Sequence, residues 1–351
     1  MKVYIFMAIM PFVVSLFFKD INKSEKQKKI YCVICGIILT LLLGMRSRHI
    51  GSTDTNGYYD MMKNAIRSTS WSSYYVKDFV EKGFQFFLWT LSRIFKDPQW
   101  VIVISSAIYT TCISIFICRY SKNVCLSFTM YICLGLMTFC MQGMRQAIAI
   151  SVCLLAYNFA KKKKFVPFVA MVFLAWCFHQ TAIVFLVVYM LTFIKLKPLH
   201  IMTVIAGIVI AILLSDRLIS GANELFGKNY HGAIDSGGFV ATAIYVLIIV
   251  FSIFVAKRPI RNNIDTLIFF MLIVGFVCYI ERYIGVLIAE RISFYFVASQ
   301  MILLPNAIAE GRIVKKDLWL VNGMVYCLCI ALFIYRLQGS DLLPFEFFWQ
   351  L

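Results

Sequence analysis

Apolar runs of near bilayer-spanning length recur along the whole chain, separated by short polar connections. A transmembrane helix needs about 20 mostly apolar residues, whereas a transmembrane strand needs about 10 with alternating polarity. The runs are too long for strands and do not alternate, so we predict an all-α, polytopic integral membrane protein with about twelve spans. The predicted spans are residues 3–18, 30–45, 99–118, 124–141, 144–160, 165–178, 180–194, 198–214, 239–256, 266–284, 292–308 and 318–335.

Basic residues concentrate in every second connection. The connections 19–29, 119–123, 161–164, 195–197, 257–265 and 309–317 hold 19 of the 34 Lys and Arg residues. By the positive-inside rule these connections face the cytoplasm. Both termini and two longer loops, 46–98 and 215–238, are then predicted to face outward. The formal net charge of +17 is therefore a topology signal and does not indicate nucleic acid as a partner.

Two segments depart from the regular pattern. The basic connections 161–164 and 195–197 are only about thirty residues apart, too few for two full spans, which predicts a short or re-entrant hairpin with His179 at its tip. In loop 46–98, the stretch "KDFVEKGFQFFLWTLSRIFK" is typical of a helix lying in the membrane interface. No internal repeat is present, so residues 1–351 are treated as a single transmembrane domain.

The ionisable residues outside the basic connections gather at the predicted outer ends of the spans. They include Arg46, Arg48, His49, Asp54, Arg145, His179, Glu281, Arg282, Glu290, Arg291 and Arg336. Ionisable groups near hydrocarbon are costly unless they pair or face a wet cavity. Arginine also offers a planar donor fork that suits phosphate and pyrophosphate. Their convergence at one depth predicts a cationic, outward-facing site.

Each of these residues also has an alternative without a role in catalysis or binding. Arg46, Arg48 and Arg145 could snorkel from helix ends, and Arg291 could simply pair with a neighbouring glutamate. Asp54, in "GSTDTNG", could be a turn or helix-capping residue, and His179 a histidine satisfied within the hairpin.

The sequence lacks the motifs of several familiar kinds of functional site. The twelve cysteines lie almost entirely within apolar runs, which favours packing over a disulfide framework. There is no nucleotide-binding glycine loop with Lys-Ser/Thr, no Asp-x-Asp pair and no H-E-x-x-H. We therefore expect neither a cofactor nor a metal site.

Five motifs in order carry a family resemblance: "MRSRHIGSTDTNGYYD", "MRQAIAISV", "FHQTAIVFL", "ERISFYF" and "LLPFEFFW". Over most of its length the chain resembles the EpsG-type, Wzy-like family of bacterial polysaccharide polymerases. The resemblance implies a polymerase of O-antigen, capsule or exopolysaccharide in the cytoplasmic (inner) membrane. Such an enzyme moves a growing glycan from undecaprenyl pyrophosphate to a new lipid-linked repeat unit at the outer face.

The resemblance also implies partners and roles. The partners are undecaprenyl-pyrophosphate-linked oligosaccharides and membrane lipids, with a chain-length regulator as a further candidate. A pyrophosphate leaving group is already activated, so a metal-independent transfer needs mainly positioning and stabilisation of charge. We expect Arg46, Arg48, Arg145, Arg282 and Arg291 to bind pyrophosphate. For a general base we expect His179 ahead of Asp54, with His49 as a competitor.

Other functions remain open from the sequence. A flippase or transporter of lipid-linked oligosaccharide would also need a cationic cavity, but it should expose charge along a path through the membrane. The predicted mid-membrane positions are almost free of charge, which favours outer-leaflet chemistry. An outer-leaflet glycan ligase would share the lipid-pyrophosphate site and differ only in its acceptor. An acyltransferase would need a cytoplasmic histidine constellation, and only His200 is near that face.

Overall fold

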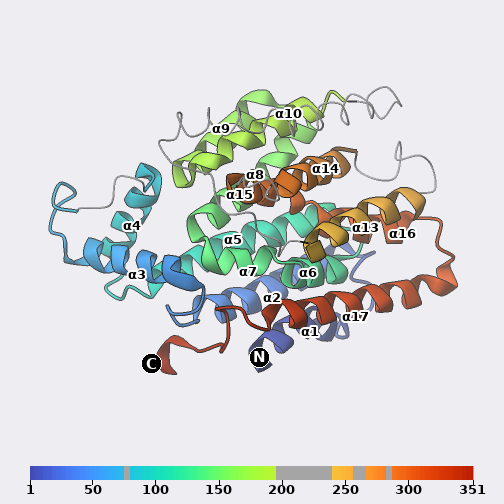
Figure 1. Ribbon diagram of the computed structural model, residues 1–351, viewed down its shortest axis with the longest axis horizontal. Coiled ribbons are helices and arrows are strands. Elements are labelled where there is room, and N and C mark those ends of the chain that lie inside the picture. Colours follow the sequence, from blue (N-terminus) through green and yellow to red (C-terminus); the bar gives the residue numbers. More distant parts are fainter. Residues whose placement is uncertain (75–79, 195–238, 256–265, 282–286, 351) are drawn as a thin grey trace. The chain divides into compact units, whose positions relative to one another are not determined.

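The computed structural model describes residues 1–74, 80–194, 239–255, 266–281 and 287–350, and its regular elements in this part of the chain are helices (Figure 1). The α-helices are α1 (Lys2–Ser15), α2 (Glu25–Gly44), α3 (Ser52–Arg67), α4 (Lys82–Ile94), α5 (Trp100–Tyr120), α6 (Val124–Cys133), α7 (Leu136–Gln142), α8 (Met144–Lys161), α9 (Phe165–Phe178), α10 (Val187–Leu191), α13 (Phe239–Val255), α14 (Thr266–Ile280), α15 (Leu287–Val297), α16 (Gln300–Glu310) and α17 (Leu318–Leu337). Short 3-10 turns are η1 (Gln180–Leu186), η4 (Lys315–Asp317) and η5 (Phe348–Gln350).

The described parts of the predicted apolar runs are mostly helical, which confirms the all-α membrane class. Run 180–194 forms η1 and the short helix α10, and run 292–308 is divided between α15 and α16. Within the described residues, four helical segments are long and apolar enough to cross a bilayer: Glu25–Gly44, Trp100–Tyr120, Ile288–Glu310 and Lys315–Leu337. A fifth is added if the bent pair α6–α7 forms one span. The figure of about twelve spans stays a prediction. The expected span 198–214 and loop 215–238 lie outside the described residues.

The contacts group the chain into two compact units, and the prediction of a single transmembrane domain is not tested by them. The first unit comprises Met1–Phe159, Lys164–Ile183 and Trp319–Leu351. The second comprises Ala160–Lys163 and Val184–Leu318. In the first unit α2 packs along α5, α1 along α6, and α4 against both α3 and α9. In the second, α14 packs along α15, and α13 along α14 and α16.

Small residues allow α2 and α5 to pack closely. A Cβ added at Gly36 would lie 2.8 Å from Ser114 Oγ, and one at Gly44 would lie 3.1 Å from the Cα atom of Val103. Between these two contacts the hydroxyls of Thr40 and Thr110 are 2.6 Å apart. Small and hydroxyl-bearing residues are what membrane helices use for close approach.

The predicted span 124–141 is not one continuous helix. It forms α6 and α7, which are bent by 50° at a short break. Gly135 has a φ of +99° there, in the left-handed region that glycine adopts without steric cost. A side chain at this position would also meet the guanidinium of Arg336, with Nη1 3.0 Å from an added Cβ. This close approach explains why the break occurs at a glycine.

Within its described residues, the predicted outward loop 46–98 contains α3 and α4. The stretch expected to lie in the membrane interface forms α4, and its place at the interface stays a prediction. The Gly/Thr/Asp-rich segment expected as a loop is instead the start of α3, which follows Gly51 with a φ of +101°. Asp54 lies in the first turn, where a carboxylate interacts favourably with the helix dipole. Arg93 of α4 holds the end of α3 by donating to the carbonyl oxygens of Ala65 (2.6 Å) and Ser68 (3.0 Å).

The C-terminal tail is bound to the end of α2. The backbone N–H of Ser47 donates to Glu346 O at 2.8 Å, and that of Phe348 donates to Met45 O at 3.0 Å. These bonds accompany an antiparallel bridge between Arg46 and Phe347. The tail therefore closes the end of α2 with backbone hydrogen bonds.

Candidate active site

The carboxylate of Glu81 is the centre of a buried polar cluster in the first unit. Glu81 is only 8% exposed, and three donors converge on it. Its Oε1 atom lies 3.0 Å from His179 Nδ1 and accepts from the backbone N–H of Gln180 at 3.1 Å. Its Oε2 atom accepts from Arg145 Nη1 at 2.5 Å. One carboxylate thus joins the two sequence-predicted residues Arg145 and His179.

Local packing brings Glu81 to His179. Glu81 is the N-cap residue of α4, and His179 is the C-cap residue of α9. The two helices approach so closely at Gly83 that an added Cβ would collide with the carbonyl oxygen of Cys177 and lie 2.6 Å from its Cβ. The rings of Phe87 and Phe178 pack edge to face beside this contact, 5.8 Å apart. The residue before Glu81 is held as well, because the side chain of Gln85 donates to Val80 O at 2.7 Å.

Arg145 reaches the cluster from the first turn of α8. Its Nε atom donates to the hydroxyl of Tyr58 at 3.4 Å, and its guanidinium lies 5.7 Å from the centre of the Tyr58 ring. The ring of Phe84 supports Tyr58 from α4 at 5.5 Å. The Arg145 side chain is 16% exposed. Its Nη2 atom has no hydrogen-bond partner among the described residues and can donate to an anionic ligand.

The electrostatics of the cluster keep Glu81 ionised. Burial on its own would raise the pKa of the Glu81 carboxyl, but the hydrogen bond from His179 and the positive charge of Arg145 outweigh it, and the pKa falls to about 2. Burial raises the pKa of the Tyr58 hydroxyl, against the opposing charge of Arg145. Glu81 is therefore a permanent anion near neutral pH and is poorly suited to act as a general base.

The bond between Glu81 and His179 orients the imidazole. When Nδ1 carries the proton and donates to a carboxylate, Nε2 carries the lone pair of the neutral ring. The carboxylate also stabilises the imidazolium that forms when the ring accepts a proton. The His179 side chain is 13% exposed. The arrangement is that of an oriented histidine beside a cation, which can move a proton and stabilise an anion.

Asp54 lies on the Tyr58 side of the same cluster. It precedes Tyr58 by one turn of α3 and is exposed, and its charge acts on the Tyr58 hydroxyl. The structure thus brings the three predicted catalytic residues, Arg145, His179 and Asp54, into one region of the first unit. Whether each takes part in a reaction stays a prediction.

Arg46 is placed differently from the expected pyrophosphate ligand. Its side chain is fully buried. Its guanidinium donates to Leu43 O, to Met141 O at 2.8 Å and to Ser106 Oγ at 3.3 Å. These bonds hold the end of α2 against α5 and α7. A role for Arg46 in binding pyrophosphate stays a prediction, and its present contacts are internal.

The other predicted ligands are not joined to Glu81 by the described contacts. The guanidinium of Arg48 lies 4.9 Å from the centre of the Tyr59 ring, and His49 is exposed. Arg291 is exposed on α15 in the second unit, which is described by itself. Arg282 lies outside the described residues. For Arg48, Arg282 and Arg291 the pyrophosphate role stays a prediction.

Sequence reasoning missed Glu81 and Tyr58. Glu81 stands in "VEKGFQFF", within the stretch that is predicted to form an interfacial helix. The sequence did not set it apart, because Glu is not among the preferred N-cap residues and the Glu81 side chain makes no cap hydrogen bond to α4. Tyr58, in "NGYYD", was not set apart either.

Comparisons with known proteins give one match. The model of the EpsG family matches residues 29–347, a range that includes Tyr58, Glu81, Arg145 and His179. No curated protein and no solved structure matches the chain. Within the described residues, no group of three His, Cys, Asp or Glu side chains is placed to hold a metal ion.

Proposed function

The chain belongs to the EpsG family, and from this premise we propose that it is a polysaccharide polymerase acting on lipid-linked oligosaccharides. The proposed donor is a glycan on undecaprenyl pyrophosphate, and the proposed acceptor is a lipid-linked repeat unit. We place the reaction at the outer face of the cytoplasmic membrane, because the basic connections favour that orientation. The product can be an O-antigen, a capsule or an exopolysaccharide.

The observation that supports this proposal best is the cluster of Glu81, Arg145 and His179. It combines a cation with a spare donor and an oriented imidazole, held by a single buried carboxylate. Glycosyl transfer from a pyrophosphate needs these two functions, charge stabilisation on the leaving group and proton removal from the acceptor.

The proposed reaction assigns one step to each residue. The acceptor hydroxyl oxygen attacks the anomeric carbon of the donor sugar, and its proton passes to Nε2 of His179. The bond between the anomeric carbon and the pyrophosphate oxygen breaks, and its electron pair stays on that oxygen. Undecaprenyl pyrophosphate leaves, with its developing charge facing Arg145. Glu81 holds the ring and balances the imidazolium charge, as a carboxylate does in a catalytic triad.

An extension assay with purified protein also distinguishes two other functions. An outer-leaflet ligase would use the same donor chemistry with a different acceptor. A flippase would bind the lipid-linked unit and leave it unchanged. The buried proton acceptor beside a cation favours chemistry over transport, since transport needs no proton transfer from a hydroxyl.

The experiment is an extension assay with purified protein. A defined lipid-pyrophosphate repeat unit is incubated in detergent without nucleotide or added metal, and products are separated on a gel. We expect wild type to form a ladder of repeats. Arg145→Ala and His179→Gln should each slow extension by about 100-fold or more, because one removes the cation and the other the proton acceptor.

Matched controls come from the same outward segment. Arg67→Ala and His49→Gln remove an arginine and a histidine that are exposed and make no contact with Glu81. Arg67→Ala should keep the full ladder. His49→Gln tests the competing general base, and we expect it to keep the full ladder because His49 makes no described contact with the cluster. A ladder from His179→Gln equal to wild type would remove His179 from the mechanism. A wild-type protein that binds the unit but never extends it, even with other acceptors present, would favour the flippase.

A further inference from the structure

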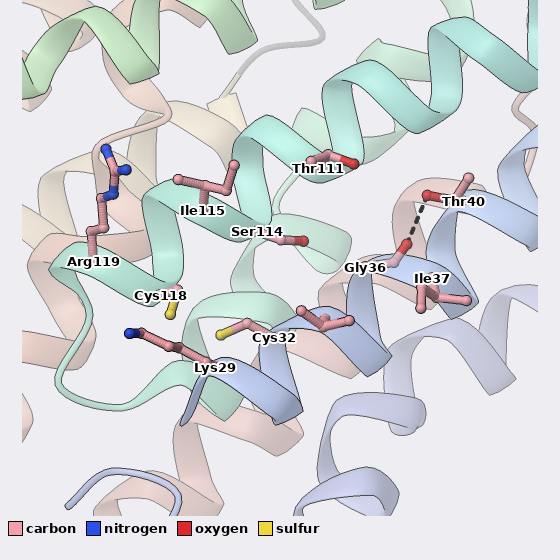
Figure 2. A pocket seen from close by; sticks show the side chains of 11 residues that line it. Lys29, Cys32, Gly36, Ile37, Thr40, Thr111, Ser114, Ile115, Cys118 and Arg119 are labelled. Carbon is pink, nitrogen blue, oxygen red and sulfur yellow. Dashed lines mark hydrogen bonds between the residues drawn. The ribbon is translucent and has the colours of Figure 1, made fainter. Parts of the chain in front are cut away.

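A groove of about 450 Å³ runs between α2 and α5 in the first unit, separate from the Glu81 cluster. Figure 2 shows its residues, which are Lys29, Cys32, Val33, Gly36, Ile37 and Thr40 from α2 and Thr111, Ser114, Ile115, Cys118 and Arg119 from α5. Its volume is within the range of about 300–1,000 Å³ that is typical of small-molecule sites. Exposed side chains on its walls, including Val33, Ile37 and Thr111, leave it open to the side.

The two ends of the groove differ in charge. Lys29 and Arg119 lie together at one end, and Thr40 lies at the other, where its hydroxyl donates to Gly36 O at 2.8 Å (Figure 2). Both cations are exposed. The first turns of α2 also carry Lys28 and Glu25, whose charges oppose one another, so the end keeps a net positive charge. The positive-inside rule assigns this end to the cytoplasmic side.

A buried hydroxyl points into the middle of the groove. Ser114 is 7% exposed, and its Oγ atom has no hydrogen-bond partner within the part of the chain that the structure describes. A hydroxyl buried without a partner is costly, and native proteins rarely leave one. Gly36 faces this hydroxyl from α2, where an added Cβ would lie 2.8 Å from Ser114 Oγ, so no side chain at position 36 competes for the hydroxyl.

We propose that this groove binds an anionic phospholipid of the cytoplasmic leaflet. One acyl chain lies along the apolar walls, the glycerol ester reaches the hydroxyl of Ser114, and the phosphate is held by Lys29 and Arg119. Basic pockets between membrane helices on the cytoplasmic side suit anionic headgroups for this reason.

This inference does not depend on the proposed glycosyl transfer. The groove lies along residues 29–40 of α2, whereas the end of α2 at Met45 leads into the segments that carry Tyr58 and Glu81. A failure of the polymerase assay would therefore not contradict the lipid site. A failure of the lipid-binding test would likewise not contradict the proposed polymerase.

The test is native mass spectrometry of the purified full chain with two lipids of identical acyl chains, phosphatidylglycerol and phosphatidylcholine. We expect wild type to prefer phosphatidylglycerol. The double variant Lys29→Gln, Arg119→Gln should lose this preference, by about fivefold for each charge removed. Thr111→Trp should fill the groove and weaken the first-bound lipid while both cations remain.

A charge-matched control separates a site from general surface charge. Lys26→Gln with Lys122→Gln removes two exposed cations of the same connections that do not line the groove. This control should keep the wild-type preference. An equal loss in the control would overturn the site, as would an unchanged preference in the groove variants. Tighter binding of undecaprenyl phosphate than of phosphatidylglycerol, lost in the groove variants, would overturn the choice of occupant.

Discussion

At the scale of single residues, Glu81 decides the character of the cluster. Its carboxylate receives donors from α8, α9 and the turn after α9. Removing one partner of a buried pair typically costs about 3–5 kcal/mol, because the remaining charge is left without compensation. Glu81 is therefore expected to matter for folding as well as for chemistry.

The pH dependence of stability tests this role. Because the folded-state pKa of about 2 lies below the ordinary glutamate value, ionised Glu81 stabilises the fold fully above that ordinary value. This contribution is lost as the pH falls towards 2. The difference in unfolding free energy between wild type and Glu81→Gln should thus shrink as the pH falls below about 4. Denaturation in detergent between pH 6 and pH 2 measures it, and a difference that stays unchanged down to pH 2 would contradict an ionised Glu81.

The sequence identified Arg145 and His179 but not the residue that joins them. Glu81 is 64 positions from Arg145 and 98 from His179. Hydrophobic periodicity and residue spacing report on neighbours within an element, and contacts at such separations depend on how the helices pack. The same reason explains Arg46, since its burial follows from α5 and α7 covering it, which its place at a helix end did not reveal.

At the scale of elements, the close contact between α4 and α9 positions the cluster. Gly83→Ala should displace α4 from Cys177, at a cost of about 1–3 kcal/mol for overpacking, and separate Glu81 from His179. Thermal unfolding in detergent together with the extension assay measures both effects. We expect lower stability and activity from this single methyl group.

Gly57 offers the matched control for this prediction. It lies inside α3, and a Cβ there would meet nothing within 4 Å. Gly57→Ala should be neutral or slightly stabilising, since alanine favours a helix over glycine by roughly 1 kcal/mol. If both variants behave alike, the contact at Gly83 does not position the site.

Most helices were predictable from apolar runs, but the positions at which a helix breaks were not. A run such as "CLSFTMYICLGLMTFCM" is uniformly apolar, so Gly135 gave no reason to divide it. The left-handed backbone there accompanies the approach of Arg336, from a helix near the other end of the chain. Conversely, "STDTNGYYD" reads as a loop by composition, yet it forms the first half of α3 because apolar residues at helical spacing follow it.

At the scale of the whole molecule, the distribution of basic residues predicts orientation. Alkaline phosphatase fused after Ser340 should be active, because that enzyme matures only outside the cytoplasm. Green fluorescent protein inserted after Lys163 should fluoresce, since that connection carries four lysines and is predicted inside. Phosphatase activity and fluorescence, both measured in whole cells, report the side of the membrane on which each fusion point lies. The opposite pattern would place Glu81 and its partners on the cytoplasmic side and exclude outer-leaflet transfer.

The tail bound to α2 has a consequence for how the protein is made. Met45 and Ser47 leave the ribosome long before their partners Glu346 and Phe348 are made. The end of α2 therefore lacks these backbone partners until the segment after α17 has been synthesised. A chain that stops before Glu346 would keep the described helices up to α17 and leave this end open, so quality-control proteases have a local feature by which to recognise it.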